Sequence, residues 1–118
     1  MGKEGFMRYV LLINLDKTMP RPEKAEQEAI FLGHQRFEAA LGGKLVHTER
    51  LGLDGEASRI SLKAGHPLVT DGPFAETKEV LGGFYVIECD TMDEAIEWAK
   101  KIPLRADRMI EVRPIRPM

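Results

Sequence analysis

The stretch GGFYVIECDTMDEAIEWAKKIP, residues 82–103, joins the pattern of a buried strand directly to that of a capped helix, which indicates a mixed α+β fold. In residues 82–89 both alternating sets of side chains are apolar, which is typical of a strand covered on both faces. The tetrapeptide TMDE then fits a capping box, with Thr91 as the N-cap and Glu94 three residues later. This pattern predicts a helix that ends at Pro103 and turns four apolar side chains inward: Ala95, Trp98, Ala99 and Ile102.

Another strand and helix are predicted near the start of the chain. The run RYVLLIN, residues 8–14, is also apolar in both alternating sets, so we expect a second strand covered on both faces. A helix is predicted over residues 22–41, with Pro22 at its first position and Gly42-Gly43 ending it. Helical spacing places four residues on its apolar stripe: Ile30, His34, Phe37 and Leu41.

The segments between these elements also have strand and turn patterns. KLVHTERLGL and EASRISLK, residues 44–63, are predicted to form a β-hairpin that turns at Asp54-Gly55. A second turn at residues 64–66 sends the chain back through a short strand at 67–70. Residues 109–115 form the last strand, and Pro114 indicates that its far end lies at a sheet edge.

This order, β-α-β-β with an extra strand followed by β-α-β, predicts one α+β domain over residues 1–118. It fits the ferredoxin-like plan, with an antiparallel sheet that carries both helices on one face. Residues 1–6 have no periodic pattern and are expected to be a disordered or extended N-terminal segment.

Both helices are predicted to lie on one face of the sheet. The apolar side chains that the strands at residues 8–14 and 82–89 turn to the other face therefore have no cover within the chain. Because an exposed apolar sheet face is a partner surface, we predict a homodimer through these faces. The contacts are expected from Leu11 and Val86 or from their opposite-facing neighbours.

Composition narrows the function classes. Lys and Arg number 17 against 19 for Asp and Glu, so the basic footprint typical of nucleic-acid binding is missing, and no nucleic-acid partner is expected. Cys89 is the only cysteine, which excludes an internal disulfide and suits the cytoplasm.

The sequence has neither a metal-ligand cluster nor a nucleotide-binding or nucleophile motif, so no metal or cofactor is predicted. The longest apolar run, residues 9–13, is too short to cross a bilayer, so no membrane association is expected.

The connection VTDGPFAETKEVLGGF, residues 69–84, is the first candidate site, because long loops in small domains are often functional. Asp71, Gly72 and Pro73 suit a tight turn, and Phe74 can anchor the loop to the core. Alternatively, Asp71 is a general base or holds a substrate hydroxyl. Both interpretations stay open at this point.

Four further residues are candidates for binding or catalysis. Lys78, balanced by Glu76, can hold an anionic substrate, and Arg59 can bind a carboxylate with its planar guanidinium. The alternative for these three is an exposed, solvated surface. His34 titrates near neutrality and can move protons, although a histidine on an apolar helix stripe is more often a core residue.

The eleven-residue run VTDGPFAETKE, followed by GGFYVIE, by a capped helix ending W-A-x-x-I-P and by EVRPI, resembles the DGPF-domain branch of the YCII-related proteins. The resemblance runs from about Met7 to the end of the chain, and residues 71–79 and 82–85 carry most of it. It implies a ferredoxin-like chain that dimerises into an α+β barrel.

The same resemblance implies roles for particular residues. In the YCII branch a His and an Asp lining a cleft are associated with catalysis, which implies these roles for His34 and Asp71. Gly72, Pro73, Phe74, Glu76, Lys78 and Arg59 would then bind the substrate. The DGPF branch also implies a functional link to an extracytoplasmic-function sigma factor.

Three classes of function follow. The first is a small cofactor-independent enzyme of isomerase or lyase type acting on a small acidic or aromatic metabolite. The second is a regulatory accessory protein that binds such a metabolite without turnover. The third is a dimeric interaction domain whose loop is structural. The fold alone does not choose among them.

Overall fold

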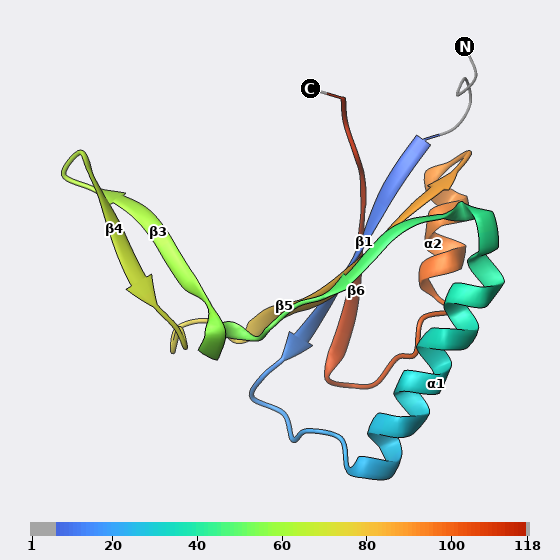
Figure 1. Cartoon of the computed structure of the whole chain (residues 1–118), viewed down its shortest axis with the longest axis horizontal. Coiled ribbons are helices and arrows are strands. Elements are labelled where there is room, and N and C mark those ends of the chain that lie inside the picture. Colours follow the sequence, from blue (N-terminus) through green and yellow to red (C-terminus); the bar gives the residue numbers. More distant parts are fainter. Residues whose placement is uncertain (1–6, 118) are drawn as a thin grey trace.

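A computed structural model describes residues 7–117, which form six strands and two helices (Figure 1). The predicted N-terminal segment 1–6 lies outside the described residues. In chain order the elements are β1 (Met7–Asp16), α1 (Lys24–Leu41), β2 (Leu45–Arg50), β3 (Ser58–Lys63), β4 (His66–Asp71), β5 (Glu79–Cys89), α2 (Met92–Ala99) and β6 (Arg108–Pro114).

The main sheet has four strands in the order β2-β5-β1-β6, and every neighbouring pair is antiparallel. The two strands predicted to be covered on both faces, β1 and β5, are the central ones. The last strand β6, which contains Pro114, lies at an edge as predicted. Both helices cover the same face of the sheet (Figure 1). This arrangement confirms the ferredoxin-like α+β fold.

The core lies between this sheet and the helices. Tyr9, Leu11 and Ile13 of β1 point into it together with Tyr85, Ile87 and Cys89 of β5, and Leu11 and Ile87 are completely buried. The predicted stripe of α1 faces the same core, since Phe37 and Leu41 are both about 3% exposed. The other buried members are Tyr9, Ile13, Tyr85, Cys89, Ala95, Ala99 and Ile102.

Helix boundaries follow local capping chemistry. Thr91 caps α2 as predicted, because its hydroxyl accepts a hydrogen bond from the Glu94 amide at 3.1 Å. Helix α2 ends at Ala99, before the predicted stop at Pro103. Helix α1 begins at Lys24 rather than Pro22, because Glu23 is extended and its amide donates to the Glu26 carboxylate at 3.3 Å. Gly42 ends α1 with a φ of 54°, which favours glycine.

The predicted hairpin at Asp54-Gly55 is wrong. Strand β2 pairs with β5, while β3 pairs with β4 through the turn at Ala64-Gly65 that the sequence also indicated. The physical reason is that the Asp54 carboxylate is used elsewhere: it pairs with the Lys17 ammonium and accepts the Phe74 amide at 3.2 Å. Residues 54–56 form a short 3-10 turn instead of a hairpin turn.

Strands β3 and β4 form a separate two-stranded ribbon, residues 58–71, which we call the arm. It leaves the body on the side of the sheet away from α1 and α2 (Figure 1). The radius of gyration is 16.6 Å, compared with about 13 Å for a compact domain of this length. The arm therefore makes the shape extended.

The sheet face opposite the helices, which we call the open face, has an apolar centre. Val10 lies beside Val86, and Leu12 lies beside Phe84. All four side chains are partly exposed. Leu11, which the sequence proposed as a contact residue, instead lies completely buried under the helices. Alternation along β1 therefore leaves its neighbours Val10 and Leu12 for the open face.

Candidate functional site

The partly buried interface between α1 and β5 holds a chain of three polar side chains. Tyr85 on β5 donates its hydroxyl hydrogen to the Glu38 carboxylate at 2.8 Å. The same hydroxyl lies 2.8 Å from Nδ1 of His34. Because a tyrosine hydroxyl has one hydrogen, and here it goes to Glu38, the Nδ1–H of His34 is the donor in the second bond. The neutral imidazole then carries its free electron pair on Nε2.

Packing fixes the positions of these groups. The His34 ring stacks on Tyr85 with centroids 5.9 Å apart, and Phe37 meets Tyr85 edge to face at 5.0 Å. Helix α1 brings His34, Phe37 and Glu38 onto one side, since they are three and four positions apart. The orientation of His34 is therefore set by both its ring contact and its hydrogen bond.

The surroundings favour the neutral forms of His34 and Tyr85. Burial, and to a smaller extent the positive charge of Arg108, lower the pKa of His34 below its ordinary value of 6.5. Glu38 acts in the opposite direction but does not outweigh them. Burial and the bond to Glu38 raise the pKa of Tyr85 far above its ordinary value. At pH 7, His34 is a neutral base held by a neutral phenol.

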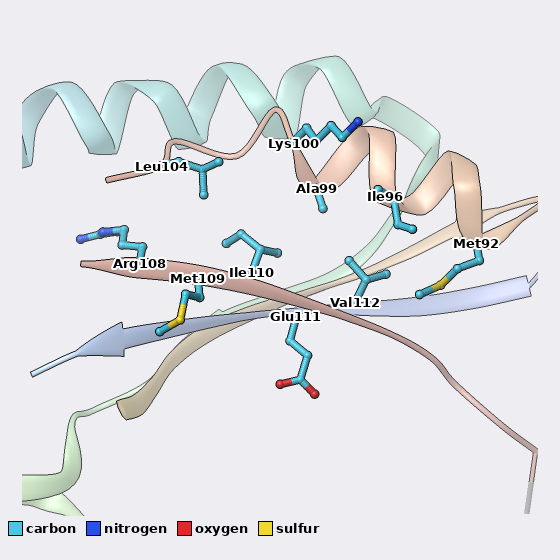
Figure 2. A pocket seen from close by; sticks show the side chains of 10 residues that line it. All are labelled: Met92, Ile96, Ala99, Lys100, Leu104, Arg108, Met109, Ile110, Glu111 and Val112. Atoms are coloured by element: carbon cyan, nitrogen blue, oxygen red, sulfur yellow. The ribbon is translucent and has the colours of Figure 1, made fainter. Parts of the chain in front are cut away.

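Arg108, whose charge acts on His34, also lies at one end of a groove between α2 and β6 (Figure 2). The groove has a volume of about 650 Å³, and Met92, Ile96, Leu104, Ile110 and Val112 give it an apolar lining. Within the part of the chain that the structure describes, Nε of Arg108 is buried without a hydrogen-bond partner. The nearest carboxylate oxygen of Asp107 is 3.7 Å away. Arg108 therefore places a positive charge, ion-paired with Asp107, at one end of the groove.

Asp71 lies in a different region from His34. It is the last residue of β4, at the base of the arm, and its side chain is exposed. Its carboxylate accepts a hydrogen bond from the Ser58 hydroxyl at 2.7 Å across the arm. Helix α1 is on the far side of the sheet from the arm (Figure 1). One chain therefore does not bring Asp71 and His34 together, and the catalytic role of Asp71 stays a prediction.

The DGPF loop, residues 71–79, fastens the base of the arm to the body. Phe74 is 8% exposed, as expected of an anchor. Lys17 donates to the Phe74 carbonyl at 2.7 Å and pairs with Asp54, which in turn accepts the Phe74 amide. We call Lys17, Asp54 and Phe74 the bracket. These contacts tie β1, the 54–56 turn and the DGPF loop to one another.

Replacing Gly72 with any other residue would force the backbone to move. Its peptide bond to Pro73 is cis, and its amide donates to the Ala57 carbonyl at 2.8 Å. A Cβ atom at position 72 would lie 1.8 Å from the Asp54 carbonyl oxygen. The turn chemistry proposed for this motif therefore includes a close approach between two backbone segments.

The charged candidates around the loop mostly contact one another. Arg59 pairs with Glu76 at 2.6 Å, and its guanidinium lies 3.8 Å above the Phe74 ring. The bond from Arg59 lowers the pKa of Glu76. The Lys78 side chain is exposed, while its carbonyl accepts the Lys17 amide at 2.9 Å. The substrate-binding roles of these residues stay predictions, and their contacts stabilise the loop.

Sequence reasoning found His34 but missed Tyr85, Glu38 and Arg108 as its partners. Tyr85 belongs to a strand with two apolar sets, so its hydroxyl gave no separate signal, and it lies 47 positions from Glu38. Lys17 and Asp54 were missed because one lies in a loop and the other fitted a hairpin turn. The spacing of His34 and Glu38, four residues on one helix, was the only local signal available.

Within residues 7–117, no group of three or more His, Cys, Asp or Glu side chains could hold a metal ion. None of the helices described there is long and apolar enough to span a membrane. Cys89 is buried, and burial raises the pKa of its thiol, which agrees with a core role.

Comparison with known sequences places the chain in a family. The sequence model of the YCII-related domain matches residues 7–118. The chain belongs to the YCII-related family. An uncharacterised protein of Rhizobium meliloti (strain 1021) is 43% identical over 114 residues, covering 92% of each chain. YCII-related membership confirms the family seen in the sequence, while the DGPF branch within it stays a prediction.

Proposed function

We propose that this YCII-related protein is a homodimeric, cofactor-independent enzyme of isomerase or lyase type in which His34 transfers a proton. The observation that carries this proposal is the hydrogen-bonded chain from Glu38 through Tyr85 to His34, with both distances at 2.8 Å. A general base needs a fixed orientation and a free electron pair, and this chain of contacts supplies both.

The proposed step uses Nε2 of His34. This nitrogen takes a proton from a substrate carbon next to a carbonyl group, and the imidazolium that forms is stabilised through Nδ1–H, Tyr85 and the Glu38 carboxylate. Return of the proton to another atom completes an isomerisation, while departure of a leaving group from the neighbouring carbon completes an elimination. The lowered pKa of His34 supports the role, because the ring is ready to accept a proton at pH 7.

Arg108 indicates the substrate class. Arg108 lines the apolar groove, and its positive charge acts on His34. A guanidinium binds carboxylates through paired hydrogen bonds. A small carboxylate with an apolar body and a carbonyl group fits these surroundings. This agrees with the acidic or aromatic metabolite expected from the sequence.

The open face supports the homodimer. Two rows of side chains cross it, and each has two apolar residues in the middle and polar residues at its ends. The end groups pair within their own strands: His47 with Glu49 at 2.9 Å, and Arg113 with Glu111. Such pairing lowers the cost of bringing a second sheet close. We expect a total buried area above roughly 1,200 Å² and a dimer by light scattering at micromolar concentration.

Deuterium exchange tests proton transfer without knowledge of the natural substrate. The protein is incubated in D₂O with a panel of small 2-oxo and 3-oxo carboxylates, and loss of the proton signal beside the carbonyl is followed by NMR. Wild type should accelerate exchange for at least one compound, and His34→Gln should abolish the acceleration. His66→Gln is the matched control, because His66 is exposed at the tip of the arm.

Two results would contradict the enzyme proposal. One is equal exchange with wild type and His34→Gln. The other is a compound that raises the melting temperature of wild type while no compound on the panel exchanges faster than without protein. The second result would favour the regulatory, non-catalytic alternative.

A further inference from the structure

The arm presents an apolar surface that the chain itself does not cover. Ile60 and Leu62 of β3 share one face with Pro67 and Val69 of β4. Their exposed fractions are large, with 71% for Ile60, 73% for Leu62 and 61% for Val69. A two-stranded ribbon is at best marginally stable in water when neither face is covered. This face therefore needs a partner surface.

The contacts at the base of the arm hold it in a defined direction. The bracket residues Lys17, Asp54 and Phe74 tie it to the body, and Arg59 of β3 is held by Glu76 and the Phe74 ring. Gly72 packs directly against the Asp54 backbone. An arm surrounded only by solvent gains nothing from being held in one direction. An arm that docks on a partner does gain, because less conformational entropy is then lost on binding.

The same chain carries a second uncovered apolar surface, the groove between α2 and β6. Met92, Ile96 and Leu104 on its upper wall are 38%, 36% and 55% exposed. Ile110 and Val112 of β6 point into the groove from below (Figure 2). The outer edge of β6 has no pairing strand within the described residues. An unprotected edge beside an apolar groove is a typical docking place for a β-ribbon.

We propose that the arm of one protomer docks its apolar face, formed by Ile60, Leu62, Pro67 and Val69, into the α2–β6 groove of a second copy. The six-residue strands of the arm are about 20 Å long, and the seven residues of β6 extend about 23 Å, so the lengths match. The arm does not reach its own groove, because it leaves on the side of the sheet away from the helices.

A second copy accounts for both surfaces at once. Two chains related by a two-fold axis would exchange arms reciprocally, so that each arm and each groove is covered in a closed dimer. A different protein could cover both surfaces only if it had an apolar groove for the arm and a β-ribbon for the α2–β6 groove. This inference rests on the dimer proposed above and adds a second contact to the one through the open face; it does not depend on proton transfer.

Site-specific photo-crosslinking tests the docking. Leu62 is replaced by p-benzoylphenylalanine, a substitution that an exposed position tolerates, and this chain is mixed with ¹⁵N-labelled wild type. After irradiation, mass spectrometry should find adducts between position 62 and residues 92–112 of the labelled chain. The same group at Ser61, on the opposite face of the arm, should give at least fivefold fewer of these adducts.

Each alternative outcome has a defined meaning. A dimer by light scattering without adducts to residues 92–112, or with equal adducts from position 61, overturns the arm docking and leaves the open-face dimer standing. Adducts only within one chain overturn it too. A monomer overturns both dimer contacts, while the exchange test with His34→Gln still decides on proton transfer.

Discussion

His34 and Asp71 lie in two regions that differ in burial and in partners. His34 packs from α1 against β5, where it is bonded to Tyr85 and has a lowered pKa. Asp71 is exposed at the base of the arm and bonded to Ser58. The DGPF motif is more conspicuous in the sequence, yet its contacts fasten a loop, whereas the hydrogen-bonded chain of the proposed function is at His34. A distinctive motif can therefore mark a structural contact, and a less distinctive residue can mark the chemistry.

The largest expected effect is at Phe74, in the DGPF loop that fastens the base of the arm to the body. Phe74→Ala should lower the free energy of unfolding by about 3 kcal/mol, because it removes a buried ring and leaves a cavity under Arg59. Chemical denaturation measures this. Phe31→Ala is the control, since Phe31 on α1 is 62% exposed and its loss should cost less than about 0.5 kcal/mol. Similar losses in both variants would show that the DGPF loop is not anchored.

Gly72→Ala should have the next largest effect. The added methyl group meets the Asp54 carbonyl oxygen, so one backbone segment must move, at a cost of about 1–3 kcal/mol. Gly55→Ala is the matched control, because a Cβ atom at position 55 meets nothing within 4 Å. Thermal unfolding of the two variants gives the comparison. A stable Gly72→Ala variant with an unchanged melting temperature would contradict the close approach.

Thr91→Ala tests the cap of helix α2. Loss of the hydroxyl that accepts the Glu94 amide should cost about 1 kcal/mol, without a change in oligomeric state. The denaturation midpoint measures the loss, and Thr70→Ala in the exposed strand β4 serves as the control. A wild-type midpoint for both variants would show that the capping hydrogen bond does not contribute to stability.

The smallest effect is expected at Asp71. Asp71→Asn keeps an oxygen acceptor for the Ser58 hydroxyl, so stability should change by less than about 0.5 kcal/mol. Deuterium exchange catalysed by the protein should be unchanged as well. Loss of exchange with an intact fold would instead support the catalytic role that the sequence suggested for Asp71, and would require that it meets His34 across two chains.

Local patterns predicted much of the fold. The strands β1 and β5, the cap at Thr91, the stripe of α1 and the edge position of Pro114 all depend on neighbouring residues or on alternation. The pairing of β2 with β5 was missed because Asp54-Gly55 has the composition of a hairpin turn, while a tertiary contact to Lys17 decides its conformation.

The candidate site was less predictable for the same reason. His34 could be named from its place on an apolar stripe, but its tautomer depends on Tyr85, which is 51 positions away. The anchoring role of Phe74 was predictable because burying a large apolar side chain beside a turn is favourable. The bracket around it was not, since Lys17 and Asp54 are distant in sequence from the DGPF motif and carry no motif of their own.

Glu38 and Tyr85 hold His34 as a neutral base protonated on Nδ1. Because the pKa of His34 is lower in the folded than in the unfolded chain, the folded state binds fewer protons between these values. The stability that His34 contributes is therefore complete above about pH 6.5 and is lost as the pH falls through the folded pKa. His34→Gln should remove this part of the acid sensitivity.

Long-range ¹H–¹⁵N NMR of the histidine rings across a pH titration reports both the tautomer and the pKa of His34, and His34→Gln assigns its signals. We predict that His34 carries its proton on Nδ1 at pH 7 and titrates below the ordinary histidine pKa of 6.5. A proton on Nε2, or a His34 midpoint at or above 6.5, would contradict this prediction.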